Sequence, residues 1–211
     1  MIATTLIAAT DLGARRVEIV ARREFPRTVT WWERAGFTKL AEIPHGWVMG
    51  RPLPVAVAVP DAEAMRALGR RLAGLLRAGD VVVATGELGA GKTTLSQGIG
   101  AGLDVEGPII SPTFVISRVH RARAAGPDFV HVDGYRLGSA GELDDIDLQE
   151  TLPTSVTLVE WGRGLAEGLS PDRLEVEIHR SLDPDDDERT VYLFGIGERW
   201  IGVLEALRSH P

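Results

Sequence analysis

The chain has 211 residues, enough for one well-buried domain and a smaller piece, and no cysteine, which excludes disulfides, thiolate catalysis and Cys-based zinc sites. No apolar run reaches about 18 residues, so no membrane span or membrane contact is expected. The net charge of −7 is uneven, with +3 over residues 1–53 and −10 over residues 54–211, and an acidic larger part disfavours a broad nucleic-acid-binding surface.

The first segment, residues 1–10, is mildly apolar and has no basic stretch before its apolar residues. Threonines interrupt it, so we expect a strand or a buried segment and not a signal peptide. Without an export signal and without cysteines, a cytoplasmic location is expected. The elements predicted next are a strand at 17–21, a helix over 26–36, and two more strands from 37 and at 47–49.

One stretch of this region, WWERAGF (31–37), resembles a segment near the C-terminal end of GNAT-type acetyltransferases. The resemblance implies a small α+β GNAT-like half-domain over residues 1–53. The acetyltransferase pyrophosphate loop, [QR]-x-x-G-x-[GA], is absent upstream, so we expect no acetyl transfer. Such a piece docks on the rest of the chain or completes itself by dimerising, and a remnant that only adds stability is an equal alternative.

Two prolines, Pro52 and Pro54, disfavour a continuing helix and remove strand donors, so they predict a boundary and a second domain over residues 54–211. Apolar runs and a good N-cap then define the start of that domain. The elements predicted are a strand at 55–59, a helix from Asp61 to 79–80, and a strand buried on both faces at 81–85.

A glycine-rich segment, GELGAGKTT (86–94), follows that strand and leads into a helix that begins near Lys92. It matches the phosphate-binding pattern GxxxxGK[ST] in full, in the strand–loop–helix context that a P-loop requires. The residues expected to bind the nucleotide are Gly86, Glu87, Leu88, Gly89, Ala90, Gly91, Lys92, Thr93 and Thr94.

The residue types of the glycine-rich segment suit phosphate chemistry. Glycines allow backbone angles that turn successive N–H groups toward phosphate oxygens, and the following helix adds the positive end of its dipole. We expect Lys92 to reach the β- and γ-phosphates and the Thr93 hydroxyl to ligate Mg²⁺. The chain has 21 arginines and only two lysines, so a lysine here indicates a need for a compact point charge.

Beyond the glycine-rich segment, strands alternate with short helical stretches, which is typical of an α/β domain with a mainly parallel central sheet and antiparallel hairpins. Arginines in and beside the loop 120–126 form either a solvated tip or a contact for a partner or tRNA. The elements predicted are strands at 113–119, 128–132 and 156–159, a partly helical stretch at 140–151, a hairpin of 174–179 and 190–194 around the acidic loop 183–187, and a helix at 201–207.

Two carboxylates, Glu160 and Asp133, stand directly after apolar strands. A carboxylate in this place is either a loop cap or, beside a nucleotide, a group that holds Mg²⁺ or polarises water. With the glycine-rich segment present, we favour function for both. His131 has no partner at metal-ligand spacing and is expected to lie on a strand face. The guanine-reading pattern [NT]KxD is absent, which favours ATP over GTP.

The order of these motifs resembles the TsaE family, small ATPases of bacterial tRNA threonylcarbamoyladenosine synthesis. The resemblance covers residues 60–200, although Glu87 replaces the aspartate usual in the family's loop. The family's D-x-Y-R pattern is kept as Asp133, Tyr135 and Arg136. The matching stretches are LGRRLAGLLRAGD, VVVATGELGAGKTTLSQGIGAGL, SPTFVIS (111–117), HVDGYRL (131–137), ELDDIDLQE (142–150) and LVEWGRGL (158–165).

The resemblance implies a P-loop ATPase that hydrolyses ATP in support of the TsaB and TsaD proteins, of which TsaD transfers a threonylcarbamoyl group to the adenosine beside the tRNA anticodon. It implies catalytic Lys92, Glu160 and Asp133, with Asp133 near the γ-phosphate and Thr93 and Glu160 at Mg²⁺. Residues 111–113 are then expected to sense the nucleotide. Contact with tRNA is expected only through the complex.

Further roles are expected for residues around the site. Trp161 either lies beside the nucleotide or packs in the core, and the helix start at 61–65 is expected to border the adenine. Arg189 is expected to approach the nucleotide, and Arg136 is the arginine-finger candidate within the chain. Three other functions stay open: a small-molecule kinase on the same core, an interaction protein in which ATP binding matters more than hydrolysis, and an acetyltransferase activity in residues 1–53, which acetyl-CoA binding would reveal.

Overall fold

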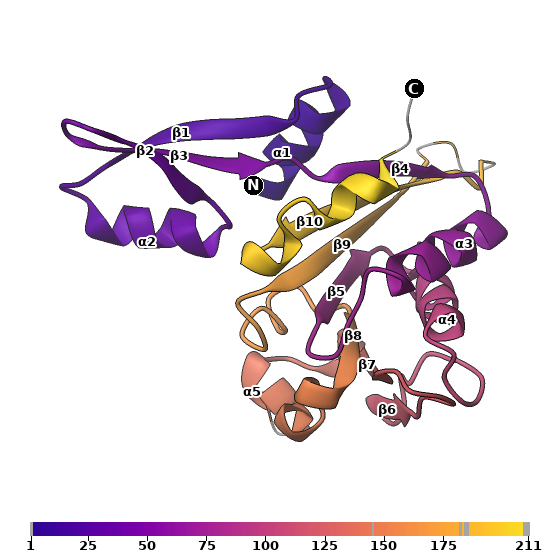
Figure 1. Cartoon of the computed structure of the whole chain (residues 1–211). Helices are drawn as coiled ribbons and strands as arrows, with labels where there is room; N and C mark the ends of the chain where they lie inside the picture. Colours follow the sequence, from indigo (N-terminus) through magenta and orange to yellow (C-terminus); the bar gives the residue numbers. More distant parts are fainter. Residues whose placement is uncertain (1, 145, 182, 184–185, 209–211) are drawn as a thin grey trace. The chain divides into compact units, whose positions relative to one another are not determined.

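The structure, a computed structural model, describes residues 2–144, 146–181, 183 and 186–208. The chain divides into two compact units, Met1–Ala56 and Val57–Pro211, which are described separately below (Figure 1). The division falls a few residues after the boundary that the prolines predict. Within the described residues, no helix has both the length and the apolar character needed to cross a membrane.

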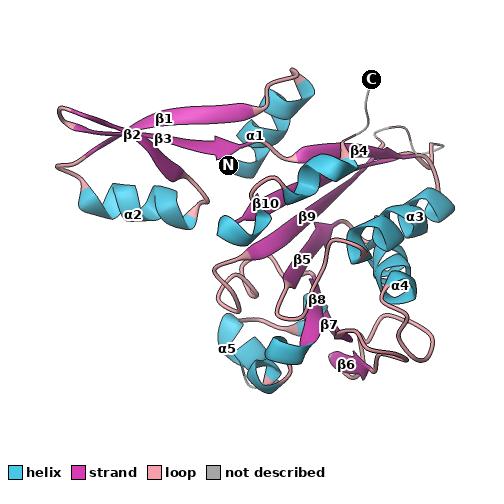
Figure 2. Cartoon of the chain, in the orientation of Figure 1, coloured by secondary structure: helices cyan, strands magenta, loops and turns pink. Residues whose placement is uncertain are grey.

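The N-terminal unit contains a three-stranded antiparallel sheet with the strand order β1-β3-β2 (Figure 2). Its small core is made by Ala21, Val29, Phe37 and Met49. The predicted helix and three strands are confirmed, while the GNAT resemblance stays a prediction. The elements are α1 (Ile2–Asp11), β1 (Arg16–Arg22), α2 (Pro26–Arg34), β2 (Thr38–Ile43) and β3 (Gly46–Pro52).

The first segment is the helix α1, so the strand considered for residues 1–10 was wrong. Threonine favours strands, and three threonines gave this stretch a strand-like composition. The alanines and leucine between them favour a helix, and they decide the local structure. Leu6 and Ile7 are buried, as the alternative of a buried segment required.

The larger unit is built on a seven-stranded sheet with the order β4-β10-β9-β5-β8-β7-β6. β5 runs parallel to β9 and β8, and β7 runs parallel to β8. β10 and β6 are antiparallel to β9 and β7, so the predicted mainly parallel sheet with antiparallel strands is confirmed. The strands are β4 (Val55–Val59), β5 (Val81–Gly86), β6 (Ser117–His120), β7 (Asp128–Asp133), β8 (Ser155–Glu160), β9 (Arg173–Arg180) and β10 (Arg189–Ile196).

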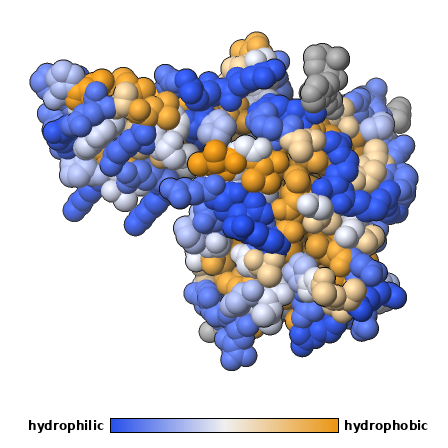
Figure 3. Space-filling model, viewed as in Figure 1, coloured by the Kyte–Doolittle hydropathy of each residue, from blue (hydrophilic) through white to orange (hydrophobic). Residues whose placement is uncertain are grey.

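The central strands of the larger unit are covered on both faces, as their continuous apolar runs predict. Every residue of β8 is buried, and β5 is buried over 81–84. Valines of β5, β7 and β8 pack against Leu143, Leu148 and Ala166 from the later part of the chain. The visible surface is largely hydrophilic, with hydrophobic residues showing in patches (Figure 3).

Helices α3 (Ala62–Ala73) and α4 (Lys92–Gly102) lie side by side (Figure 1). Two glycines permit this close approach. A Cβ on Gly69 would lie 2.6 Å from a backbone carbonyl oxygen of α4, and a Cβ on Gly98 would lie 2.3 Å from a backbone carbonyl oxygen of α3. Both distances are shorter than a van der Waals contact, so the two helix backbones pack directly against each other.

The strand predicted at 113–119 was largely wrong, because β6 begins only at Ser117. The carbonyl oxygen of Pro112 accepts the N–H groups of Val115 and Ile116, which makes a tight turn in place of a strand. Ile116 has a φ of +66°, a left-handed angle that a β-branched residue rarely adopts.

The predicted helix start at Asp61 is confirmed, since its side chain accepts the Ala64 N–H at 2.8 Å. The predicted end at 79–80 was wrong, because the helix ends at Ala73. The short closing helix expected at 201–207 is confirmed over Val203–Leu207 as a 3₁₀ helix, and its start was misplaced by two residues, because Gly202, at a φ of +74°, separates it from a preceding 3₁₀ helix. The hairpin of β9 and β10 is confirmed, and the acidic loop 183–187 lies partly outside the described residues.

The larger unit also contains short helices in its connecting segments. They are η1 (Gly134–Arg136), α5 (Ala140–Asp144), η2 (Leu148–Glu150), η3 (Leu152–Thr154), η4 (Glu198–Trp200) and η5 (Val203–Leu207).

Candidate functional site

The carboxyl ends of three neighbouring parallel strands, β5, β8 and β7, meet at one edge of the sheet. Glu160 ends β8 and pairs in register with Ala84 of β5 and Asp133 of β7. The glycine-rich segment leaves β5 at this edge and continues into α4. The two carboxylates singled out in the sequence therefore lie beside the glycine-rich segment, at the edge where open α/β sheets bind ligands.

The glycine-rich segment folds through backbone angles that favour glycine. φ is +75° at Gly89 and +107° at Gly91, both in the left-handed region. At Gly86 a Cβ would lie 2.7 Å from the carbonyl oxygen of Ile178. Gly91 is the N-cap of α4, so the first turn of an 11-residue helix, whose N–H groups attract anions, opens into the site.

The side chain of Lys92 is held inside the glycine-rich segment. Its Nζ donates hydrogen bonds to the carbonyl oxygens of Gly86 and Glu87, both at 2.8 Å. The same Nζ lies 3.8 Å from the centroid of the Trp161 ring. Burial lowers the pKa of Lys92, and the charges of two nearby carboxylates oppose this shift. The ammonium is therefore pre-placed beside the loop, against carbonyl groups that a phosphate oxygen would replace.

Glu160 is buried and joins the strand edge to α4. Its Oε2 accepts a hydrogen bond from Thr93 Oγ1 at 3.0 Å. Its Oε1 accepts from Ser96 Oγ at 3.2 Å and from His131 Nε2 at 2.7 Å. The hydroxyl and carboxylate oxygens of Thr93 and Glu160 thus lie side by side, and oxygens of these types are the ligands that Mg²⁺ prefers.

Asp133 holds the turn that precedes β6. Its Oδ2 accepts hydrogen bonds from Ser111 Oγ at 2.6 Å and Thr113 Oγ1 at 2.7 Å, and its Oδ1 accepts the Tyr135 N–H at 3.0 Å. Burial alone would raise the pKa of Asp133, but the bonds from Ser111, Thr113 and Tyr135 outweigh burial, and the pKa lies below its ordinary value. The segment 111–113 is therefore tied to this carboxylate while Asp133 is ionised.

A small pocket of about 150 Å³ opens between the start of α3, the glycine-rich segment and the end of the β9–β10 hairpin. It brings together two groups that the sequence only suggested, the helix start at 61–65 and Arg189. The pocket presents apolar, acidic and basic groups that an adenosine placed here would contact. The lining residues are Asp61, Ala62, Met65, Gly89, Ala90, Gly91, Thr94, Asp187 and Arg189.

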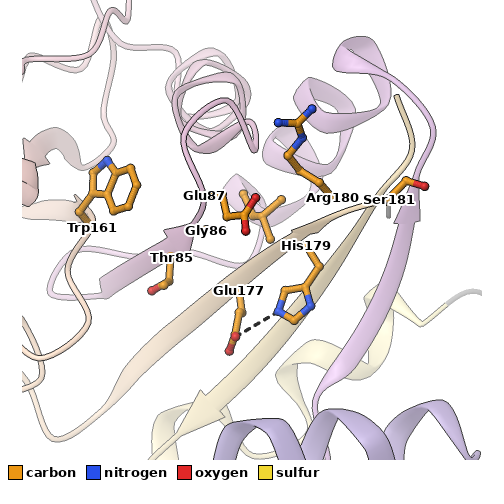
Figure 4. A pocket seen from close by; sticks show the side chains of 9 residues that line it. Thr85, Gly86, Glu87, Trp161, Glu177, His179, Arg180 and Ser181 are labelled. Carbon is orange, nitrogen blue, oxygen red and sulfur yellow. Dashed lines mark hydrogen bonds and ion pairs between the residues drawn. The ribbon is translucent and has the colours of Figure 1, made fainter. Parts of the chain in front are cut away.

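A larger pocket of about 500 Å³ lies on the other side of the glycine-rich segment (Figure 4). Glu177, one of its lining residues, lies 3.1 Å from His179 Nε2 (Figure 4) and forms an ion pair with Arg163 at 2.5 Å. Trp161 faces it from the loop after β8 (Figure 4). The lining residues are Thr85, Gly86, Glu87, Trp161, Glu177, Ile178, His179, Arg180 and Ser181.

Arg136 and the arginines of the basic loop have their contacts outside the glycine-rich segment. Arg136, the arginine-finger candidate, is exposed and lies 4.9 Å from the centroid of the Phe114 ring. In the basic loop, Arg121 pairs with Asp128 at 2.5 Å and Arg123 bonds a backbone carbonyl oxygen. These contacts favour the interpretation of the basic loop as a solvated tip.

The sequence did not single out Ser96 or the contact of His131 with Glu160. Ser96 lies one turn after Thr93 on the same face of α4, a spacing that brings both hydroxyls to one neighbour. His131 stands two residues before Asp133, so both side chains point to the same side of β7. The spacing of both residues was visible in the sequence, but their shared partner required the strand order β5-β8-β7.

Comparison with known proteins gives a consistent result for the larger unit. A family model described as "Threonylcarbamoyl adenosine biosynthesis protein TsaE" matches residues 59–191. A Streptomyces coelicolor protein named "tRNA threonylcarbamoyladenosine biosynthesis protein TsaE" is 56% identical over 138 residues, which is 64% of this chain and 93% of that protein. The Mycobacterium tuberculosis protein of the same name is 54% identical over 134 residues, 60% of this chain and 80% of that protein.

Two Bacillus subtilis matches at lower identity cover a larger share of this chain. The Bacillus subtilis protein of the same name is 34% identical over 151 residues, covering 71% of this chain and 91% of that protein. The crystal structure of Bacillus subtilis YdiB superposes with a TM-score of 0.58 at 30% identity, over 73% of this chain and 93% of that chain. The family match begins at residue 59, so the N-terminal unit lies outside it.

Proposed function

We propose that this chain, which belongs to the TsaE family, binds ATP with Mg²⁺ at the glycine-rich segment and hydrolyses it to ADP and phosphate. TsaE proteins take part in tRNA threonylcarbamoyladenosine biosynthesis, and we assign this chain to the same process. Its partners in the proposal are TsaD and TsaB, with tRNA contacted only through their complex, in the cytoplasm.

One observation carries the proposal: the Thr93 hydroxyl and the Glu160 carboxylate lie 3.0 Å apart at the first turn of α4, directly after the loop that holds Lys92. A loop of backbone N–H groups, a lysine, a hydroxyl and a carboxylate are the parts that phosphoryl-transfer sites use. Among the described residues, no group of three or more His, Cys, Asp or Glu side chains could hold a metal ion, so a Mg²⁺ bound here would take its remaining ligands from phosphates and water.

The residues divide the work in the proposed reaction. The N–H groups of the glycine-rich segment and the α4 terminus orient the phosphates, and Lys92 moves from its two carbonyl partners to the β- and γ-phosphate oxygens. Thr93 and Glu160 hold Mg²⁺, which neutralises charge that develops on the phosphates. Asp133 lies on the γ-phosphate side and ties residues 111–113 to the site.

The proposal includes slow turnover by the protein alone. An added cation at the transition state is worth roughly a thousandfold or more in phosphoryl transfer, and Arg136 is engaged with the Phe114 ring. We therefore assign the acceleration to the partner proteins. The acidic charge of residues 54–211 accords with contact to a protein complex and not to tRNA directly.

The test is steady-state ATP hydrolysis by the purified chain, alone and with TsaB, TsaD and tRNA. We expect weak turnover alone, a clear rise with the partners, and no turnover in Lys92→Ala under either condition. Phosphorylation of a small acceptor, with no response to the partners, would establish the kinase alternative and refute the proposal.

A further inference from the structure

The two carboxylate oxygens of Glu160 have different surroundings. Oε2 accepts only from Thr93 among the hydrogen bonds of the described residues, on the side of the glycine-rich segment. Oε1 points into the protein and accepts from two buried groups, Ser96 Oγ at 3.2 Å and His131 Nε2 at 2.7 Å. One oxygen is thus anchored, and the other is presented to the site.

Of the two donors to Oε1, His131 makes the shorter hydrogen bond, and Ser96 shares its one hydroxyl hydrogen with a second acceptor. Ser96 Oγ also lies 3.0 Å from the Lys92 carbonyl oxygen, and one hydroxyl hydrogen cannot serve both acceptors fully. In the proposed role of a metal ligand, the Glu160 carboxylate has only acceptor oxygens, so His131 Nε2 carries the hydrogen of the 2.7 Å bond. His131 Nδ1 is buried and has no hydrogen-bond partner in the described part of the chain, as suits the bare nitrogen of that tautomer.

The packing around His131 restricts its ring. The side chain has no exposed surface, and its ring stacks on Phe129 at 5.9 Å with the planes 22° apart. Phe129 is also fully buried. A ring that cannot turn gives its hydrogen bond a fixed direction, as groups behind metal ligands commonly do.

We infer that His131 is a positioning residue for Glu160: it anchors Oε1 and thereby directs Oε2 to the metal position beside Thr93. This inference rests on the proposed function, because it assigns a role at the Mg²⁺ that Glu160 is proposed to hold. In this role His131 orients Glu160, the proposed metal ligand, and does not itself contact the nucleotide or the metal.

The chain offers a matched control in His120. It is also a buried histidine, and its ring, like that of His131, packs near Phe129, with the two ring centroids 6.2 Å apart. Its Nδ1 lies 3.0 Å from the Glu106 carbonyl oxygen, away from the site. Replacing His120 perturbs the same packing without touching Glu160.

The test measures Mn²⁺ binding to the full chain with a non-hydrolysable ATP analogue, by electron paramagnetic resonance, alongside ATP turnover. The variants are His131→Leu, His131→Gln and His120→Leu. The Gln amide nitrogen is as many bonds from Cβ as the imidazole Nε2, so it can donate to Oε1. We expect His131→Leu to weaken Mn²⁺ binding roughly 10- to 100-fold, His131→Gln to recover most of it, and His120→Leu to match wild type.

The outcomes separate this inference from the proposed function. Wild-type affinity in His131→Leu overturns the inference, and so does an equal loss in His131→Gln or His120→Leu, since either would indicate general loosening of the core. Absence of Mn²⁺–nucleotide binding in the wild-type chain would instead refute the proposed function and the inference with it.

Discussion

The Nζ of Lys92 lies 3.8 Å from the centroid of the Trp161 ring while it donates to two carbonyl oxygens of its own loop. Trp161 has a left-handed φ of +59°, and its backbone N–H donates to the Ala84 carbonyl oxygen at 2.9 Å. An unusual backbone angle therefore keeps an aromatic face against the cation that the proposed nucleotide requires. The phosphate binding that we propose would compete with this contact for the same ammonium group.

Trp161 should report nucleotide binding by its fluorescence. Because ATP would draw the Lys92 ammonium from the ring, we expect a change in tryptophan emission on adding ATP with Mg²⁺, and none in Trp161→Phe. Trp47→Phe is the control, since the Trp47 ring has a similar contact, 4.6 Å from Lys39 Nζ, in the N-terminal unit. An undiminished change in Trp161→Phe would show that the signal arises elsewhere.

Asp133→Asn should lower the free energy of unfolding by about 1–3 kcal/mol at neutral pH. The two hydroxyls bond to Oδ2 and the Tyr135 N–H bonds to Oδ1, and an amide, with one acceptor oxygen, cannot accept on both sides as the carboxylate does. The pKa of Asp133 is lowered in the folded state, so its contribution is complete above the ordinary value of 3.8 and is lost as pH falls through the lowered value. Urea unfolding should therefore show a constant difference in the free energy of unfolding between wild type and Asp133→Asn above pH 3.8, and a smaller difference as the pH falls below it. A difference that grows in acid would contradict the assignment of a lowered pKa to Asp133.

Gly98→Ala should destabilise the larger unit strongly. Its Cβ would meet a backbone carbonyl oxygen of α3 at 2.3 Å, and backbone cannot move aside as a flexible side chain does. We expect a loss of about 1–3 kcal/mol or more in the free energy of unfolding, from overpacking between α3 and α4. Gly126→Ala is the control, because, apart from Gly126 and its two chain neighbours, no heavy atom of the described residues lies within 4 Å of the added Cβ. Equal stability of the two variants would refute the close helix contact.

Much of the fold followed from local signals in the sequence. The continuous apolar runs predicted β5 and β8, Asp61 predicted the start of α3, and the alternating pattern predicted the β9–β10 hairpin. Lys92, Thr93, Glu160 and Asp133 were chosen because each follows a strand or a glycine turn. Their common position at one sheet edge follows from parallel strand pairing.

Other features depended on tertiary contacts that no local pattern records. The stretch before β6 has the composition of a strand, but bonds from Ser111 and Thr113 to Asp133 hold it in a turn. His131 looked like an ordinary strand residue until the register of β7 on β8 set it against Glu160. The end of α3 was missed because apolar residues at helical spacing continue past Ala73.

The central claim is that Glu160 and Thr93 form the metal side of an ATP-hydrolysing site. The most direct test compares the wild-type chain with Glu160→Gln, measuring ATP binding and ATP turnover on the same samples with Mg²⁺ and the partner proteins. We predict that Glu160→Gln still binds ATP but loses turnover by at least about 100-fold. Turnover equal to wild type in Glu160→Gln, or a wild-type chain that binds no ATP, would contradict the claim.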